Sequence, residues 1–86
     1  EKAYVASMKS DLRNLVTAEE AYFSDNNSTY GTSLGTNYRA STGVTVTIQN
    51  VTNTGWGATA AHNSTTRTCN ITLGGGATNE GEPVCN

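Results

Sequence analysis

The sequence predicts an α+β fold in which a long amphipathic N-terminal helix packs on a small antiparallel β-meander. The first observation is that apolar residues recur every three or four positions from the start of the chain to about residue 25. The second is that three later segments, within about 43–73, alternate apolar and polar residues. The third is the pair Cys69 and Cys85, which predicts one disulfide bond near the C-terminus.

Size and composition limit the chain to a single domain, residues 1–86. A domain this small buries only about 60% of the surface of its unfolded chain, so its core is marginal. Only 14% of the residues are charged, against about 25% in average soluble domains, and this uncharged polar composition is typical of exported proteins. The basic residues are scattered along the chain, so no direct nucleic-acid partner is expected.

The first element is one amphipathic helix, about 2–25, followed by a polar loop, about 26–42. At 1.5 Å per residue the helix would be about 38 Å long, which is more than a small domain can cover. Its N-terminal turns are therefore expected to project. The apolar stripe of the helix consists of Tyr4, Val5, Met8, Leu12, Leu15, Val16, Tyr22 and Phe23.

The projecting turns predict that another surface covers this end of the helix. Tyr4, Val5 and Met8 would be apolar residues on an overhang, which is unfavourable in water unless another surface covers them. The alternative is that these three side chains pack on the chain's own sheet. Glu19, next to the stripe, is expected to lie in solvent at its flank. The predicted helix–sheet core comprises Leu12, Leu15, Val16, Tyr22, Phe23, Val44, Val46, Ile48 and Ile71.

Three segments predict strands of an antiparallel meander. The segment 43–51 alternates strictly, as a half-buried strand does, and the segments 56–62 and 67–73 show the same pattern. Short polar turns separate the three segments. Ala58 and Ala60 predict the close approach of a bulky neighbour, for which we expect the aromatic end of the helix.

The glycine-rich tail, residues 74–86, is expected to be flexible and to be tied back to the third strand by a disulfide bond. In a small exported domain a bond between Cys69 and Cys85 is favoured over two free thiols. Closing a loop of about 15 residues contributes about 3 kcal/mol in the chain-entropy model. The disulfide would thus supply stability that packing alone does not.

The sequence predicts neither an enzyme nor a cofactor or metal site. His62 has no acidic neighbour in sequence that would orient it as a base. The many Ser and Thr residues lack the context of an activated nucleophile. Glu80 and Glu82 offer oxygen ligands for calcium, but the alternating carboxylates of a calcium-binding loop are absent.

Several features occur together along the whole chain. The amphipathic helix KAYVASMKSDLRNLVTAEEAYFSDN precedes the residues STYG, a strand meander and a C-terminal region bounded by Cys69 and Cys85. This combination resembles the soluble part of a bacterial type IV pilin. The resemblance implies a pilin-like roll, whose helix continues upstream of Glu1 as a hydrophobic, membrane-held half. Gly31 departs from the family, in which many relatives have proline after the tyrosine.

The resemblance implies a structural subunit of a type IV pilus, which polymerises through its helix and displays a polar head for adhesion, motility or DNA uptake. Tyr4, Val5 and Met8 would then contact helices of neighbouring subunits, and Cys69 and Cys85 would bracket an outward-facing loop. The implied partners are copies of the same chain and other pilus-assembly proteins, while the isolated domain is expected to be a monomer. The implied location is a cell-surface filament, and the inner membrane before assembly, where only the upstream segment would touch the membrane.

Two other functions remain open. A pseudopilin of a type II secretion system would share the helix and much of the sheet, but the cysteine pair favours the pilus, since major pseudopilins usually stabilise this region with calcium. A secreted glycan-binding module would use Trp56 and Tyr38 as a stacking platform. That hypothesis predicts that the two rings are exposed and adjacent.

Overall fold

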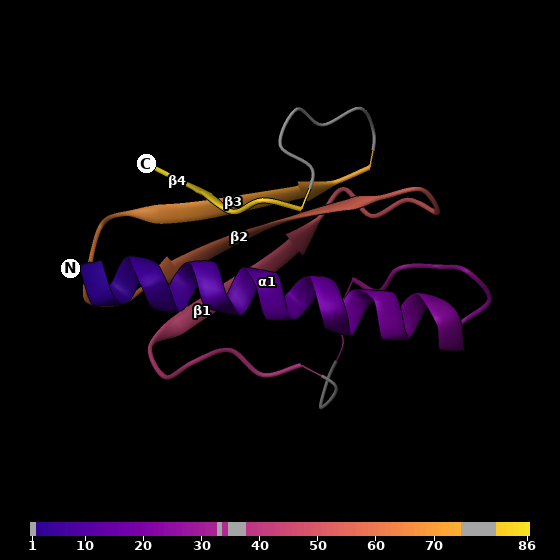
Figure 1. The fold of residues 1–86 in the computed structure, drawn as a ribbon, viewed down its shortest axis with the longest axis horizontal. Coiled ribbons are helices and arrows are strands. Elements are labelled where there is room, and N and C mark those ends of the chain that lie inside the picture. Colours follow the sequence, from indigo (N-terminus) through magenta and orange to yellow (C-terminus); the bar gives the residue numbers. More distant parts are fainter. Residues whose placement is uncertain (1, 33, 35–37, 75–80) are drawn as a thin grey trace.

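The fold is one helix on one four-stranded antiparallel sheet, which confirms the predicted α+β class. The computed structural model describes residues 2–32, 34, 38–74 and 81–86. The strands lie in the order β1-β2-β3-β4, and each pairs with the next in the antiparallel sense. Helix α1 lies across one face of this sheet (Figure 1). The elements are α1 (Lys2–Asp25), β1 (Val44–Gln49), β2 (Trp56–His62), β3 (Thr68–Leu73) and β4 (Val84–Cys85).

Strand β4 lies in the segment for which the sequence predicts a flexible tail. The predicted disulfide joins Cys69 to Cys85, which lie directly opposite each other in the β3–β4 ladder with a Cα–Cα distance of 4.0 Å. Beyond it, the Asn86 backbone N–H donates to the Thr68 carbonyl at 3.1 Å. The Asn86 side-chain oxygen accepts from the Thr68 N–H at 2.9 Å. The covalent bond and these hydrogen bonds hold the chain end against β3.

Helix α1 ends at Asp25 because the residues that follow form a C-terminal cap. Asn27 and Ser28 adopt positive φ angles of 56° and 60°. The Ser28 N–H donates to the Phe23 carbonyl at 3.0 Å, as in a Schellman motif. The Asn26 side chain donates to the carbonyl of Tyr22 at 2.9 Å. Carbonyls of the last helical turn therefore keep hydrogen-bond partners.

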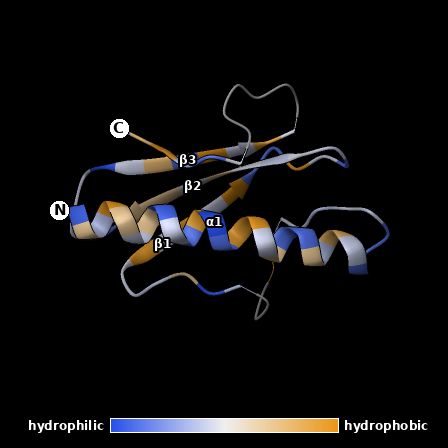
Figure 2. Cartoon of the chain, viewed as in Figure 1, coloured by the Kyte–Doolittle hydropathy of each residue, from blue (hydrophilic) through white to orange (hydrophobic). Residues whose placement is uncertain are grey.

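One hydrophobic core lies between α1 and the sheet. Figure 2 shows apolar and polar residues alternating along α1, as expected of a helix with one buried face. The buried apolar residues are Met8, Leu12, Leu15, Leu34, Val44, Trp56, Ala58, Ala60, Cys69 and Ile71. Met8, Leu12 and Leu15 are the large α1 side chains buried in this cluster with Ala58 and Ala60.

The aromatic end of α1 contacts a loop. The Tyr22 ring lies beside Gly31, where a Cβ atom would be 3.1 Å from the ring. Phe23 stacks on Tyr30 with ring centroids 4.6 Å apart. Figure 1 shows the loop after α1 folding back along the last turns of the helix. Tyr22 also packs against the core that contains the small residues of β2, whereas Phe23, which the sequence assigns to the helix–sheet core, is not among the described residues of that core.

The remaining predicted core residues differ in their burial. Val44 and Ile71 are buried, and Val46 and Ile48 on the same face of β1 are half-buried and pack against the core. Val16 also packs against the core from the side of α1. The apolar face of β1 is thus covered less completely than those of β2 and β3.

Helix α1 does not project from the domain as its length predicts. Its 24 residues span about 36 Å, and Met8, close to its N-terminal end, is fully buried in the core between helix and sheet. Its first turn lies beside the β2–β3 turn (Figure 1), where the rings of Tyr4 and His62 have centroids 4.4 Å apart. The sheet is therefore long enough to cover the N-terminal turns.

Candidate functional site

The three residues predicted to form a subunit interface lie in different environments. Met8 is fully buried in the core of the single chain, so its assignment to an interface between subunits is wrong. Val5 is half-buried and packs against the core. Tyr4 is 37% exposed and stacks on His62. Met8 is buried because the sheet extends beneath the first turns of α1. The sequence does not reveal how far the sheet extends.

The exposed face of α1 is composed of small residues without charge. At 100° per residue, seven exposed positions fall on one side of the helix, opposite the buried stripe. These residues are Ala3, Ala6, Ser10, Asn14, Thr17, Ala21 and Ser24. The charged residues Lys2, Lys9, Arg13 and Glu20 follow one flank of this face. A face of small side chains allows the backbone of another helix to approach closely.

Asp11 fixes the far part of the loop that follows α1. Its side chain is only 4% exposed, and its carboxylate accepts from the Ser41 N–H at 3.0 Å and from the Ser41 hydroxyl at 2.9 Å. The Tyr38 hydroxyl donates to the Asp11 backbone carbonyl at 2.8 Å. Burial, together with the nearby Asp11 charge, raises the pKa of Tyr38 to about 12. The hydroxyl therefore remains a donor at physiological pH.

Glu19 fixes the near part of the same loop. Its side chain is fully buried, which contradicts the expected position in solvent. One carboxylate oxygen accepts from the Gly31 N–H at 2.8 Å, and the other has no hydrogen-bond partner. Burial raises the pKa of Glu19, and the hydrogen bond from Gly31 opposes this effect in part. The loop thus closes over a carboxyl group that the interior disfavours in its charged form.

The raised pKa of Glu19 predicts a pH dependence of stability. The native state holds this proton more tightly than the unfolded state, whose Glu has a pKa near 4.5. Between that value and the native pKa, the unfolded chain releases the proton while the native chain retains it, so the free energy of unfolding falls as pH rises. Above the native pKa the Glu19 contribution no longer changes with pH.

We expect Glu19→Gln to remove this slope, because its side chain carries no charge while its carbonyl oxygen still accepts from Gly31. The measurement is urea unfolding of both proteins from about pH 4 upward. The exposed neighbour provides the matched control, Glu20→Gln, which should keep the slope of the parent protein. Equal slopes in the parent protein and Glu19→Gln would contradict the raised pKa of Glu19.

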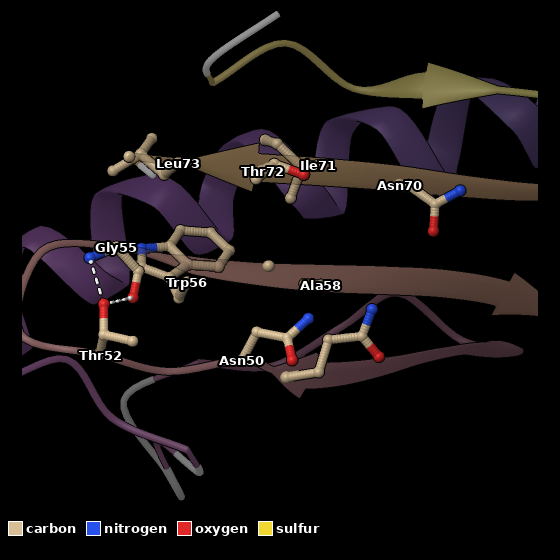
Figure 3. A pocket seen from close by; sticks show the side chains of 12 residues that line it. Asn50, Thr52, Gly55, Trp56, Ala58, Asn70, Ile71, Thr72 and Leu73 are labelled. Carbon is tan, nitrogen blue, oxygen red and sulfur yellow. Dashed lines mark hydrogen bonds between the residues drawn. The ribbon is translucent and has the colours of Figure 1, made fainter. Parts of the chain in front are cut away.

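A pocket with a mixed polar and apolar lining lies on the sheet where β1, β2 and β3 meet, and it has a volume of about 370 Å³. Gln49, Gly57 and Thr72 lie side by side across three strands, and Gly57 leaves a hollow because it has no side chain. Asn50 and Asn70 also line the pocket (Figure 3). The described residues that line it include no charged side chain, so the pocket offers amide and hydroxyl groups for hydrogen bonding.

The aromatic platform of the glycan-binding hypothesis does not form. Trp56 is only 2% exposed, because β2 directs its ring into the core beside Ala58 and Ala60. Tyr38 is half-buried, and its hydroxyl is bonded to Asp11. A buried indole and an engaged phenol cannot stack on a sugar ring.

The remaining ionisable groups form no larger constellation in the described part of the chain. The His62 ring nitrogen Nδ1 accepts from the Ser64 N–H at 3.0 Å, so it caps a turn. Glu82 faces Arg13 at 4.0 Å, with both side chains mostly exposed, where such pairs contribute little. Glu80 lies outside the described residues. Among those described, no group of three or more His, Cys, Asp or Glu side chains is placed to hold a metal ion.

Comparisons of this chain with protein-family models, curated proteins and solved structures gave no significant match. Within the described residues, no helix combines the length and the apolar character needed to cross a membrane.

Proposed function

We propose that this domain is a structural subunit of a type IV pilus filament, in which α1 packs against the helices of neighbouring copies. The proposal draws on the pilin-like sequence pattern described above. The fold is compatible with it, because the pattern implies a long N-terminal helix on an antiparallel meander whose C-terminal region is closed by a disulfide bond.

The observation that carries the proposal is the composition of the exposed face of α1. A helix face that meets only water usually carries many charged residues. Here the exposed face, which includes Ala3, Ala6 and Ser10, contains no charged residue. In the proposed filament this face takes the place of Met8 as the contact with neighbouring helices.

The polar sheet face and the disulfide-closed end then form the head of the subunit, which is exposed on an extracellular filament. Before assembly, a hydrophobic segment upstream of Glu1 would hold the subunit in the inner membrane. The disulfide between Cys69 and Cys85 favours a pilus over a type II secretion pseudopilus, which usually uses calcium in this region.

The proposal predicts that a bulky charge on the exposed face of α1 blocks filament assembly. Ser10→Arg in the full-length protein should abolish surface filaments, because an arginine prevents close approach of a second helix and its charge would be buried there. The isolated domain should keep its free energy of unfolding within about 0.5 kcal/mol, since the position is exposed.

Electron microscopy of producing cells measures the filaments, and urea unfolding measures the domain. Asn53→Arg, in the exposed turn between β1 and β2, is the control that should leave assembly intact. Normal filaments from cells that produce Ser10→Arg and from cells that produce Ala6→Arg would refute the proposed contact.

A further inference from the structure

We propose that two copies of this chain pair edge to edge through β1, so that their sheets join into one continuous antiparallel sheet. The proposal concerns a surface other than the exposed face of α1 and does not depend on the filament. It differs from the sequence-based expectation that the isolated domain is a monomer.

Strand β1 is the longer of the two edge strands of the sheet. The other edge is β4, which has only two residues and is fixed to β3 by the disulfide. Strand β1 has six residues and pairs with β2 alone. A long edge strand exposes a row of N–H and C=O groups to which another strand can add.

The phase of the β1–β2 ladder identifies which backbone groups face outward. The Asn63 N–H donates to the Gly43 carbonyl at 3.1 Å, so this pair is a hydrogen-bonded pair of the ladder. Hydrogen-bonded pairs recur every second residue in an antiparallel ladder. Thr45 and Thr47 therefore bond to β2, whereas the N–H and C=O of Val46 point away from it.

The outward groups of Ile48 follow the same alternation as those of Val46. The Val44 N–H agrees with this phase, because it donates to the Ser41 carbonyl at 3.0 Å and not to β2. Among the described residues, no hydrogen bond joins the outward groups of Val46 or Ile48 to another segment. These two residues thus offer a donor and an acceptor each.

The edge strand also lacks three of the features that usually prevent strand addition, namely charged residues, proline and bulges. Between Arg39 and Arg67 the chain contains no Asp, Glu, Lys or Arg. Strand β1 contains no proline, and its register with β2 runs without interruption from Val44 to Gln49. Nothing on this strand would repel a second copy.

A second copy of β1 matches the outward backbone groups and the side chains of this strand. In the register centred on Thr47, Val46 lies opposite Ile48 of the second copy, and each N–H meets a carbonyl. Thr47 lies opposite Thr47 of the second copy on the polar face, a favourable cross-strand pair. The half-buried side chains of Val46 and Ile48 gain further cover from their counterparts. This pairing satisfies the outward groups of both residues and leaves the Val44–Ser41 bond intact.

Substitutions at Thr47 test the pairing, because its side chain is exposed and lies at the centre of the proposed two-fold axis. Sedimentation equilibrium up to about 1 mM should show a monomer–dimer equilibrium for the parent domain. Thr47→Lys and Thr47→Glu should each weaken dimerisation about tenfold, since like charges would face each other across the interface. An equimolar mixture of the two variants should recover the dimer. Thr72→Lys, on the same sheet face in β3, should dimerise like the parent protein.

Amide hydrogen exchange gives a second readout at the level of single residues. Dimerisation should slow exchange at Val46 and Ile48, whereas Thr45 and Thr47 should be protected in the monomer as well. The proposal is wrong if the parent domain stays monomeric over this range. It is equally wrong if Thr47→Lys dimerises like Thr72→Lys, or if Val46 and Ile48 exchange as fast in the dimer as in the monomer.

Discussion

Reduction of the disulfide bond between Cys69 and Cys85 is expected to lower the free energy of unfolding by about 3 kcal/mol. The bond closes a loop with a sequence separation of 16 residues, and its loss lets the unfolded chain explore many more conformations. For a domain of this size the melting temperature should fall by about 12–24 °C. Only the two-residue ladder of β4 and a few hydrogen bonds would then hold the chain end.

Thermal unfolding with and without reductant measures the effect, and the double variant Cys69→Ala/Cys85→Ala should reproduce it without reductant. Treatment with a chelator alone is the control, and it should leave the melting temperature unchanged. A large loss of stability with chelator alone would favour the pseudopilin function over the pilus. A melting temperature insensitive to reductant would show that the disulfide does not support this fold.

Gly31→Pro is expected to be the most damaging single substitution in the loop, with a loss of about 3–5 kcal/mol. Proline has no N–H, so the buried carboxylate of Glu19 would lose its hydrogen bond from Gly31. The added ring would also enter a crowded place, because a Cβ at this position would lie 2.8 Å from Leu34 and 3.1 Å from Tyr22. Both effects act on the same junction between α1 and its loop.

Gly31→Ala separates the two effects, because it adds the Cβ but keeps the N–H. We expect it to destabilise the domain less than Gly31→Pro, by about 1–3 kcal/mol, since the end of the Leu34 side chain can shift. Urea unfolding of the parent protein and both variants gives the comparison. Equal stability of Gly31→Pro and the parent protein would mean that the hydrogen bond to Glu19 does not form.

The spacing of apolar residues along the sequence predicted the helix and three of the strands, because it is a local property of the chain. The helical stripe and the alternation around Val46 are properties of neighbouring residues, so a helix and strands could be expected where α1, β1, β2 and β3 occur. The pairing of Cys69 with Cys85 followed because the chain has no other cysteine. The two-residue strand β4 shows no period, and its pairing with β3 accompanies the disulfide.

The roles of Met8, Asp11 and Glu19 could not be predicted in the same way. Whether Met8 is covered depends on how far the sheet extends beneath α1, which is a long-range property. Asp11 and Glu19 do lie on the apolar stripe, three and four positions from Met8 and Leu15 respectively. Acidic residues within an apolar stripe were the available signal, but their partners Ser41 and Gly31 lie in a loop without any pattern.

Two buried acidic residues of α1 attach the described parts of the following loop to the helix. Asp11 and Glu19 are two turns apart on α1, and they bind the loop at Ser41 and Gly31. The two faces of α1 therefore make different contacts. One face holds the sheet and the loop, and in the proposed filament the opposite face, with Ser10 near its centre, contacts other subunits.

The most direct test of the filament account is the sequence that the native gene encodes immediately upstream of Glu1. We expect a stretch of about 20 apolar residues that continues the helix of α1 and holds the subunit in the membrane before assembly. A secretory signal peptide cleaved directly before Glu1 in the native protein would contradict it, because the helix would then have no segment with which to form a filament core.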